Sequence, residues 1–173
     1  MKIIEAMKKC KDIARKRDDL VAKIKVHCAH LSHETPAYAD QKSVVAGWVQ
    51  SAADSNKEIL RLRIAIQRTN LATPVTIALN DEDPPLTVTK TIAEWVLRRR
   101  ELAAQDAKIW ATLGDRGLKE GTIQNSQGQA QEVKIVRCYD PVLRDVALEV
   151  FRSEPSRIDA ALEVVNAVTD LQE

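Results

Sequence analysis

The middle of the chain gathers side chains of the kinds that bind anions. Guanidinium groups, hydroxyls and an amide occur at one predicted helix end, on the strand that follows and in the next helix. Guanidinium groups hold phosphates and carboxylates through charge-assisted hydrogen bonds of about 1.5–3 kcal/mol each, and micromolar affinity needs about 8 kcal/mol. Three or four such contacts therefore predict a site for a small anionic, nucleotide-like ligand. Its residues are Arg68, Thr69, Asn70, Thr73, Thr89, Thr91, Arg99 and Arg100.

The same side chains also fit a purely structural interpretation. Glu58, Glu94 and Glu101 lie near enough in sequence to pair with the arginines of this region. Thr69 and Asn70 would then only end a helix, because such residue types favour helix ends over helix interiors. The sequence leaves both interpretations open.

The three histidines suggest a metal site, but only weakly. His27, His30 and His33 recur at a spacing of three, and two such neighbours on a helix can share a zinc or nickel ion. A helix end that exposes its imidazoles to water has the same pattern, and no other ligand pair has metal spacing. We therefore expect no metal ion and no cofactor.

The sequence contains no catalytic motif. It has no Gly-x-Ser-x-Gly, no glycine-rich phosphate loop after a strand and no Cys with a positioned His partner. Cys10, Cys28 and Cys138 are odd in number and far apart, as expected for reduced thiols of a cytoplasmic protein. We expect a non-enzymatic protein of the cytoplasm, whether cellular or viral in origin.

Composition argues against two classes of partner. The net charge of +1 gives no bulk attraction to nucleic acid polymers. No stretch approaches the roughly 20 apolar residues that a membrane span needs. We therefore expect neither nucleic acid nor a membrane as a partner.

Long amphipathic helices must position the anion-binding side chains. Apolar residues recur at spacings of three and four in two long stretches, which predicts two helices, with Pro36 and an Asp40 N-cap between them. Together they predict an antiparallel helical hairpin over about residues 1–70. The first stripe comprises Ile3, Met7, Cys10, Ala14, Arg17, Val21, Ile24, Cys28 and Leu31, and the second comprises Val45, Trp48, Ala52, Ser55, Ile59, Leu62 and Ile66.

The rest of the chain alternates short β-hairpins with helices. Turn residues and short apolar runs predict the hairpins, and the capping box from Thr91 to Glu94 opens the third helix. Pro155 should kink or restart the last helix, with Ser153 as its cap. We predict a mainly α fold in a single domain over residues 1–173. Its later elements are a β-hairpin at about 74–89, a helix at about 91–113, a loop with a second hairpin at about 114–139 (strands 122–124 and 133–139) and a C-terminal helix at about 140–171.

Charge and helix length both predict self-association. Residues 1–33 hold nine Lys or Arg against four acids, and residues 140–173 hold three Arg against eight acids. Such helices attract each other, within or between subunits. The first helix also has more apolar faces than one antiparallel partner covers, so we expect a homo-oligomer built as a helical bundle or coiled coil.

Three short motifs resemble the septicolysin-like family of uncharacterised bacterial proteins. They are Ile66-Gln-Arg-Thr-Asn70 with Thr73, Arg99-Arg-Glu-Leu102, and Asn166 with Thr169-Asp-Leu171. The chain departs from the family at Ala167, where that family has Trp, at Pro155, and in residues 117–132. The resemblance implies a mainly helical oligomer and no established activity.

Two functions therefore follow from the sequence as expectations. The first is a non-enzymatic homo-oligomer that binds or sequesters a small anionic ligand. The alternative is a structural or protein-interaction module without a ligand. Metal binding and membrane activity rank below both of these functions.

Overall fold

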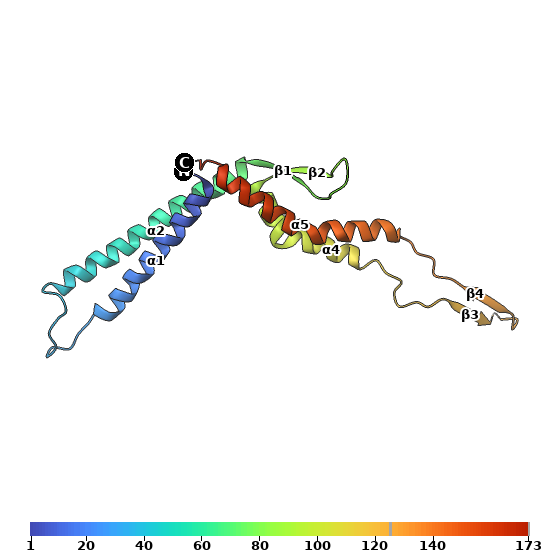
Figure 1. Cartoon of the computed structure of the whole chain (residues 1–173). Coiled ribbons are helices and arrows are strands. Elements are labelled where there is room, and N and C mark those ends of the chain that lie inside the picture. Colours follow the sequence, from blue (N-terminus) through green and yellow to red (C-terminus); the bar gives the residue numbers. More distant parts are fainter. Residues whose placement is uncertain (125, 173) are drawn as a thin grey trace. The chain divides into compact units, whose positions relative to one another are not determined.

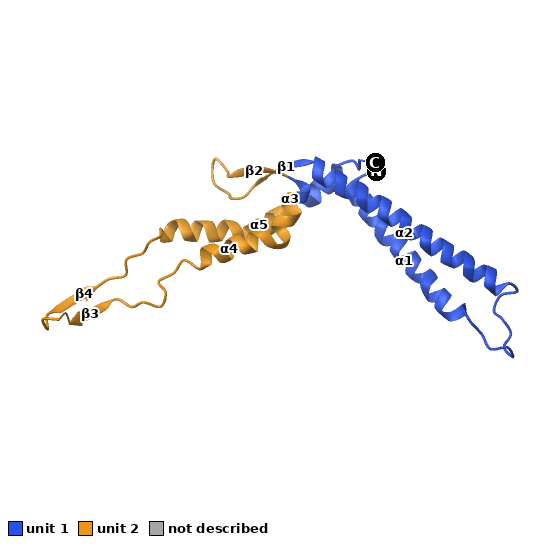
Figure 2. Ribbon diagram, turned by 180° about the vertical axis from the view of Figure 1, so that it is seen from behind, with its two compact units in different colours: residues 1–74, 91–93, 162–173 blue, residues 75–90, 94–161 orange. Residues whose placement is uncertain are grey.

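The computed structural model describes residues 1–124 and 126–172. The fold is mainly α with two inserted β-hairpins, which confirms the predicted fold class. The single domain predicted over residues 1–173 is made of two compact units (Figure 2). Unit 1 comprises residues 1–74, 91–93 and 162–173, and unit 2 comprises residues 75–90 and 94–161. Each has buried side chains of its own.

Unit 1 is built on two antiparallel helices, α1 (Ile3–His27) and α2 (Gln41–Ala72), which lie side by side (Figure 1). The Asp40 side chain accepts a 3.0 Å hydrogen bond from the Ser43 N–H and caps α2 as predicted. The predicted helical hairpin is present. Its second helix continues past Asn70, so that residue lies in the last turn and not beyond it.

The face of α1 that meets α2 differs partly from the predicted stripe. Ile3 and Ala6 are buried, and half-buried side chains continue this face at residues 10, 13, 17, 20, 24 and 27. Met7 and Val21, which were predicted on the stripe, are 43% and 51% exposed. The spacing begins 3-6-10 and not 3-7-10, which turns Met7 and Val21 toward solvent, whereas Ala14 stays half-buried.

Polar contacts tie the two helices together at the flank of this apolar face. The Lys9 ammonium lies 3.0 Å from Glu58, and the Arg61 guanidinium lies 2.9 Å from the same carboxylate. Hydrogen bonds from Arg61 and then from Lys9 lower the pKa of Glu58 to about 2. Arg17 donates a 3.0 Å hydrogen bond to Asn56 across the hairpin.

The buried side chains of unit 1 gather at the end of the hairpin near the chain termini. They are Ile3, Ala6, Ile59, Leu62, Ala65, Thr69, Ile92 and Leu162. Residues 11–27 and 41–58, which form the other half of the hairpin, contain no buried side chain.

The two ends of the chain meet in unit 1. The Leu171 N–H donates a 2.8 Å hydrogen bond to the Met1 carbonyl, and Lys2 forms a 2.8 Å ion pair with Asp170. Hydrogen bonding and attraction by Lys2 lower the pKa of Asp170. The basic start and the acidic end of the sequence thus meet within one chain, next to the end of α5 (Pro141–Val168).

Unit 2 holds the first β-hairpin, β1 (Pro74–Ala78) and β2 (Thr87–Thr91). The Leu79 N–H donates to the Leu86 carbonyl at 2.8 Å, which fixes an antiparallel register. Val75, Ile77 and Leu79 alternate with exposed residues and face inward. The fully buried Trp95 donates its indole N–H to the Val75 carbonyl at 2.9 Å.

The helix predicted at 91–113 is continuous but not uniform. It consists of α3 (Ile92–Leu97), a π-helical turn η1 (Arg98–Leu102) and α4 (Ala103–Ala111). A π turn inserts one extra residue into the helical repeat, and such turns are frequent at functional sites. This turn places two consecutive arginines, Arg98 and Arg99, against α5.

The last helix, α5, runs through Pro155 without a break, so the predicted restart there is wrong. The Ser153 hydroxyl donates to the Val150 carbonyl at 3.1 Å and does not cap a new helix. Proline removes one helical N–H, which a long helix with packed neighbours tolerates. Every helix in the described part of the chain is too short or too polar to cross a lipid bilayer.

A second antiparallel hairpin pairs β3 (Gly121–Gln124) with β4 (Ala130–Val133). The hairpin was predicted, but its second strand lies before the predicted 133–139. Seven of its eight residues are exposed, and Val133 is half-buried. A two-stranded hairpin is marginally stable alone in water.

Candidate functional site

The end of α2 holds three of the predicted anion-binding residues, Arg68, Thr69 and Asn70, and Thr69 among them has a structural role. Its side chain is fully buried, and its hydroxyl donates to the Ala65 carbonyl at 2.8 Å. The same oxygen accepts a 2.8 Å hydrogen bond from the Gln172 N–H. The hydroxyl therefore ties the C-terminal segment to α2 and is not available to a ligand.

Thr73 and the other two predicted threonines lie at the first β-hairpin. The Thr73 carbonyl accepts a 3.0 Å hydrogen bond from the Ile92 N–H, so Thr73 and Thr91 come together at the open end of the hairpin. The Thr89 hydroxyl lies 2.6 Å from that of Thr76 across the strands. These contacts hold the hairpin together.

Arg99 is engaged by an acid that the sequence interpretation did not consider. Its guanidinium lies 2.6 Å from Asp159 of α5, and both side chains are largely exposed. Of the acids expected to pair with this region's arginines, Glu58 does so, because its carboxylate lies 2.9 Å from Arg61 and 3.0 Å from Lys9. The arginines of η1 are held by acids of α5, more than fifty residues away in sequence, and Arg98 also by Asp106 of α4.

Arg98 makes the most buried charged contact of the chain. Its guanidinium donates through Nε and Nη2 to Glu154, the second bond being 2.7 Å long, and donates to Asp106 at 3.0 Å. Glu154 is 0% exposed. Hydrogen bonding to Glu154 and the charge of that carboxylate raise the pKa of Arg98, so this arginine is permanently cationic. The Phe151 ring lies 5.9 Å from the guanidinium carbon.

Two of the predicted arginines remain uncommitted. Across residues 1–124 and 126–172, neither Arg68 nor Arg100 forms an ion pair, and both are exposed. The Asn70 side-chain oxygen is buried without a hydrogen-bond partner. That oxygen is a hydrogen-bond acceptor, so it is not a group that binds an anion.

The eight predicted residues divide between the two units. Five belong to unit 1, namely Arg68, Thr69, Asn70, Thr73 and Thr91, and three belong to unit 2, namely Thr89, Arg99 and Arg100. Arg99, Thr69 and Thr89 already have protein partners. Within unit 1, Arg68 is the predicted cation that remains available for an anion.

The histidines do not converge. The His27 ring packs edge-on against Tyr38, with centroids 5.4 Å apart, and also contacts Trp48 at 5.7 Å. His30 and His33 are exposed in the α1–α2 loop. The described residues contain no group of three His, Cys, Asp or Glu side chains that could hold a metal ion.

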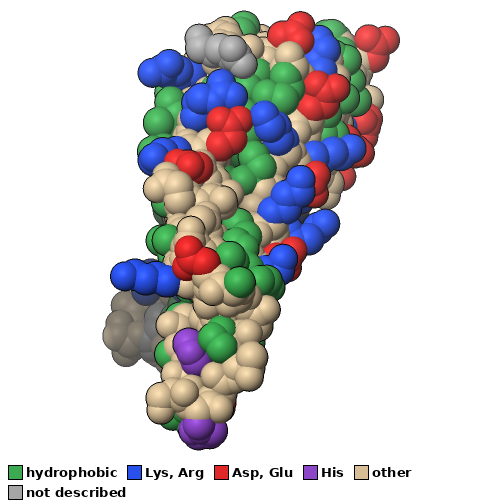
Figure 3. Space-filling model, turned by 90° about the vertical axis from the view of Figure 1, so that its left-hand side faces the viewer, with side chains coloured by type: hydrophobic (Ala, Val, Ile, Leu, Met, Phe, Trp, Pro, Cys, Tyr) green, Lys and Arg blue, Asp and Glu red, His purple; other side chains and the backbone are tan. Residues whose placement is uncertain are grey.

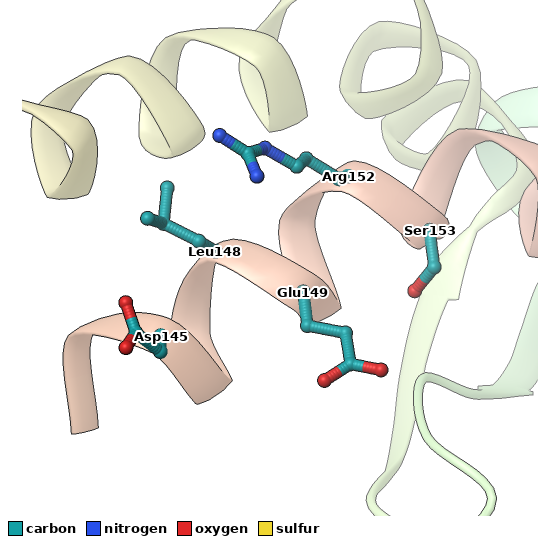
Figure 4. Close-up of a pocket in the computed structure, with 5 residues that line it drawn as sticks. All are labelled: Asp145, Leu148, Glu149, Arg152 and Ser153. Atoms are coloured by element: carbon teal, nitrogen blue, oxygen red, sulfur yellow. The ribbon is translucent and has the colours of Figure 1, made fainter. Parts of the chain in front are cut away.

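Two surface hollows of unit 2 lie along α5, and another of about 360 Å³ is lined by residues 112–116, 118 and 135–139. One is an open depression of about 560 Å³. In Figure 4, Leu148 and Arg152 project toward the neighbouring helical segment, and Glu149 and Ser153 project to the side of the β1–β2 hairpin. All its lining residues come from α5, so it is a face of one helix and not an enclosed site. They are Asp145, Leu148, Glu149, Arg152 and Ser153.

A second hollow of about 350 Å³ lies between α5 and the turn of the β1–β2 hairpin. Arg157 is its only cation and forms ion pairs of 2.6 and 2.9 Å with Asp81. The hydrogen bond from Arg157 lowers the pKa of Asp81. Its lining residues are Leu79, Asn80, Asp81, Glu82, Val146, Glu149, Val150, Ser153 and Arg157.

Sequence reasoning missed the charged contacts of α5. Glu154 precedes Ile158 and Leu162 at spacings of four, so it falls on the buried stripe of the helix. A charged residue on a buried stripe needs a partner of opposite charge, so the sequence alone could have indicated a buried ion pair here. The pairing of Arg157 with Asp81 had no sequence signal, because it depends on how the hairpin turn meets the helix.

Comparison with known proteins supports the fold. No protein-family model and no curated protein sequence matches the chain. A solved structure does: the crystal structure of a functionally unknown conserved protein from Corynebacterium diphtheriae. It is 17% identical, with a TM-score of 0.55 over 99% of each chain. At this identity the likeness concerns the fold alone, and the resemblance to the septicolysin-like family stays a prediction.

Proposed function

We propose that the protein is a non-enzymatic helical protein that functions as a homo-oligomeric assembly or interaction module. The observation that carries this is one half of the α1–α2 hairpin, residues 11–27 and 41–58, which contains no buried side chain although apolar residues recur along both helices. Helices in water are stabilised mainly by packing of an apolar face, so this half of the hairpin lacks packing that a partner would supply.

Large apolar side chains remain exposed on this hairpin. Val21, Val26 and Val49 are 51%, 70% and 51% exposed. On the face shown in Figure 3, hydrophobic side chains remain visible between charged ones. Contact with a second copy would remove such side chains from water, which is favourable.

The test is the mass of the purified protein in solution. Sedimentation equilibrium at micromolar concentration should give at least twice the chain mass of 19.3 kDa. Circular dichroism on the same sample should show the helix content of the fold. A fully helical monomer over this concentration range would overturn the proposal.

A second function, binding of a small anionic ligand, is favoured by one observation. The end of α2 presents an exposed Arg68 guanidinium that forms no ion pair with the described residues. A guanidinium binds phosphate or carboxylate in a bidentate manner. The C-terminal end of a helix carries a partial negative charge, which weakens anion binding, so assembly ranks first.

Calorimetry with a panel of nucleotides tests this second function. If a ligand binds, Arg68→Ala should weaken binding at least tenfold. The matched control is Arg15→Ala, which removes an exposed α1 arginine that lies 3.7 Å from Asp12 and should leave binding unchanged. No binding by any member of the panel would remove this function from consideration.

A further inference from the structure

α2 carries four exposed apolar side chains on a side that faces away from α1, with the polar Gln67 among them. They are Val49, Leu60, Ile64 and Leu71, which are 51%, 60%, 40% and 66% exposed. At about 100° of rotation per residue, all four fall within roughly 60° of one another. The buried residues Ile59, Leu62 and Ala65, which face α1, lie on average about 130° away. We name this exposed set the α2 outer stripe.

Two uncommitted cations flank the α2 outer stripe. Arg63 and Arg68 lie about 70° to either side of its centre by the same helical rotation. Both are exposed, and neither forms an ion pair in the part of the chain that the structure describes. The other charges of this region are engaged, since Lys57 pairs with Asp54 at 2.9 Å.

The hollow of unit 2 between α5 and the hairpin turn has the complementary character. Its apolar lining is Leu79, Val146 and Val150, and Val146 is 49% exposed. Glu82 and Glu149 lie at its rim, and neither has an ion pair among residues 1–124 and 126–172. We name it the acidic hollow.

We propose that the α2 outer stripe of one copy docks into the acidic hollow of a second copy. This rests on the proposed self-assembly and names its surfaces. Apolar side chains of the stripe would cover Val146 and Val150, and the arginines on its flanks would meet Glu82 and Glu149. Complementary charges steer association and fix the register of an interface.

Pairing of two outer stripes with each other is disfavoured by the same charges. A stripe-to-stripe contact would bring Arg63 and Arg68 of one copy to those of the other, and like charges in an interface cost free energy. The proposed contact joins two different surfaces, so it is heterologous and propagates to a ring or a filament. The acidic hollow of each copy then receives the stripe of the next.

Charge reversal on each surface tests the contact. Arg63→Glu/Arg68→Glu and Glu82→Arg/Glu149→Arg should each weaken self-association at least tenfold in sedimentation velocity at low salt. Lys23→Glu/Lys25→Glu, the same charge change on exposed α1 positions, is the control and should assemble like the parent. Circular dichroism should show parental helix content in every variant, because the reversed side chains have no ion pairs to lose.

Mixing the two charge-reversed variants is the decisive step. The acidic stripe of the first variant then meets the basic hollow of the second, and the unchanged surfaces of the two also remain complementary. An equimolar mixture should therefore recover the assembly that each variant lacks alone.

The outcomes separate this inference from the proposed function. A parent that is oligomeric while both variants assemble normally overturns the inference and leaves self-assembly standing. So does loss of assembly in one variant only, or a mixture that fails to recover. A monomeric parent overturns both.

Discussion

Replacing Arg98 with Met should destabilise the protein far more than replacing its neighbour Arg99. Glu154 is 0% exposed and depends on Arg98 for its compensating charge. Removing one partner of a buried ion pair leaves an uncompensated buried charge and costs about 3–5 kcal/mol. Arg99 pairs with Asp159, whose side chain is 61% exposed, and such a surface pair contributes about 0–1 kcal/mol.

The double replacement Arg98→Met/Glu154→Leu separates the cost of an unpaired charge from the worth of the pair. With both charges gone, apolar side chains of similar size fill the site between η1 and α5. Replacing a buried pair by apolar residues is often neutral or stabilising. The double variant should therefore be at least as stable as Arg98→Met. Its free energy of unfolding should lie within about 1 kcal/mol of that of the parent.

Urea unfolding followed by circular dichroism measures all four proteins. Equal slopes against urea are required before the free energies are compared, because a changed slope signals a changed unfolding transition. The reasoning is refuted if Arg98→Met costs no more than Arg99→Met. It is also refuted if the double variant loses as much stability as Arg98→Met does.

Three further predictions follow from single contacts. Thr69→Val removes a buried hydroxyl that pairs with two backbone groups and should cost about 1–3 kcal/mol in urea unfolding, whereas Thr76→Val on the exposed hairpin should cost less. The pKa of Glu58 is lowered to about 2 from an ordinary 4.5. Its contacts therefore contribute stability that is present above pH 4.5 and is lost as the pH falls toward 2. Thermal melts should show a smaller loss of stability on acidification in Glu58→Gln than in the parent. His30→Gln/His33→Gln should leave the melting temperature unchanged with and without a chelator, and a chelator-dependent loss in the parent would contradict this.

The long helices were predictable because their signals are local. The three–four apolar spacing and the Asp40 cap need no knowledge of tertiary contacts, and α2 begins where they indicate. The buried side of α1 was only partly predictable, since Ala6 and Met7 both fit an apolar repeat and tertiary packing decides that Ala6 is buried. Pro155 predicts a kink or a restart, and of these the restart is wrong because α5 continues through it.

The candidate site was less predictable because its residues have long-range partners. Thr69 is used by the backbone of Gln172, more than a hundred residues later. The arginines of η1 are held mainly by acids of α5, and Asp106 of α4 is a further partner of Arg98. Side-chain type indicates what a residue can bind, but the fold decides which groups are already bound, and this left Arg68 and Arg100 as the unpaired members of the predicted set.

Self-assembly and stability are physically linked in a chain of this kind. The fully buried side chains are few, and those of unit 1 lie at one end of its helical hairpin. Helices in water are stabilised mainly by packing of an apolar face and not by their intrinsic propensity. The exposed half of the α1–α2 hairpin therefore gains little from its own chain, and contact with a second copy would supply the missing packing. Such a contact binds the folded form alone and stabilises it by mass action.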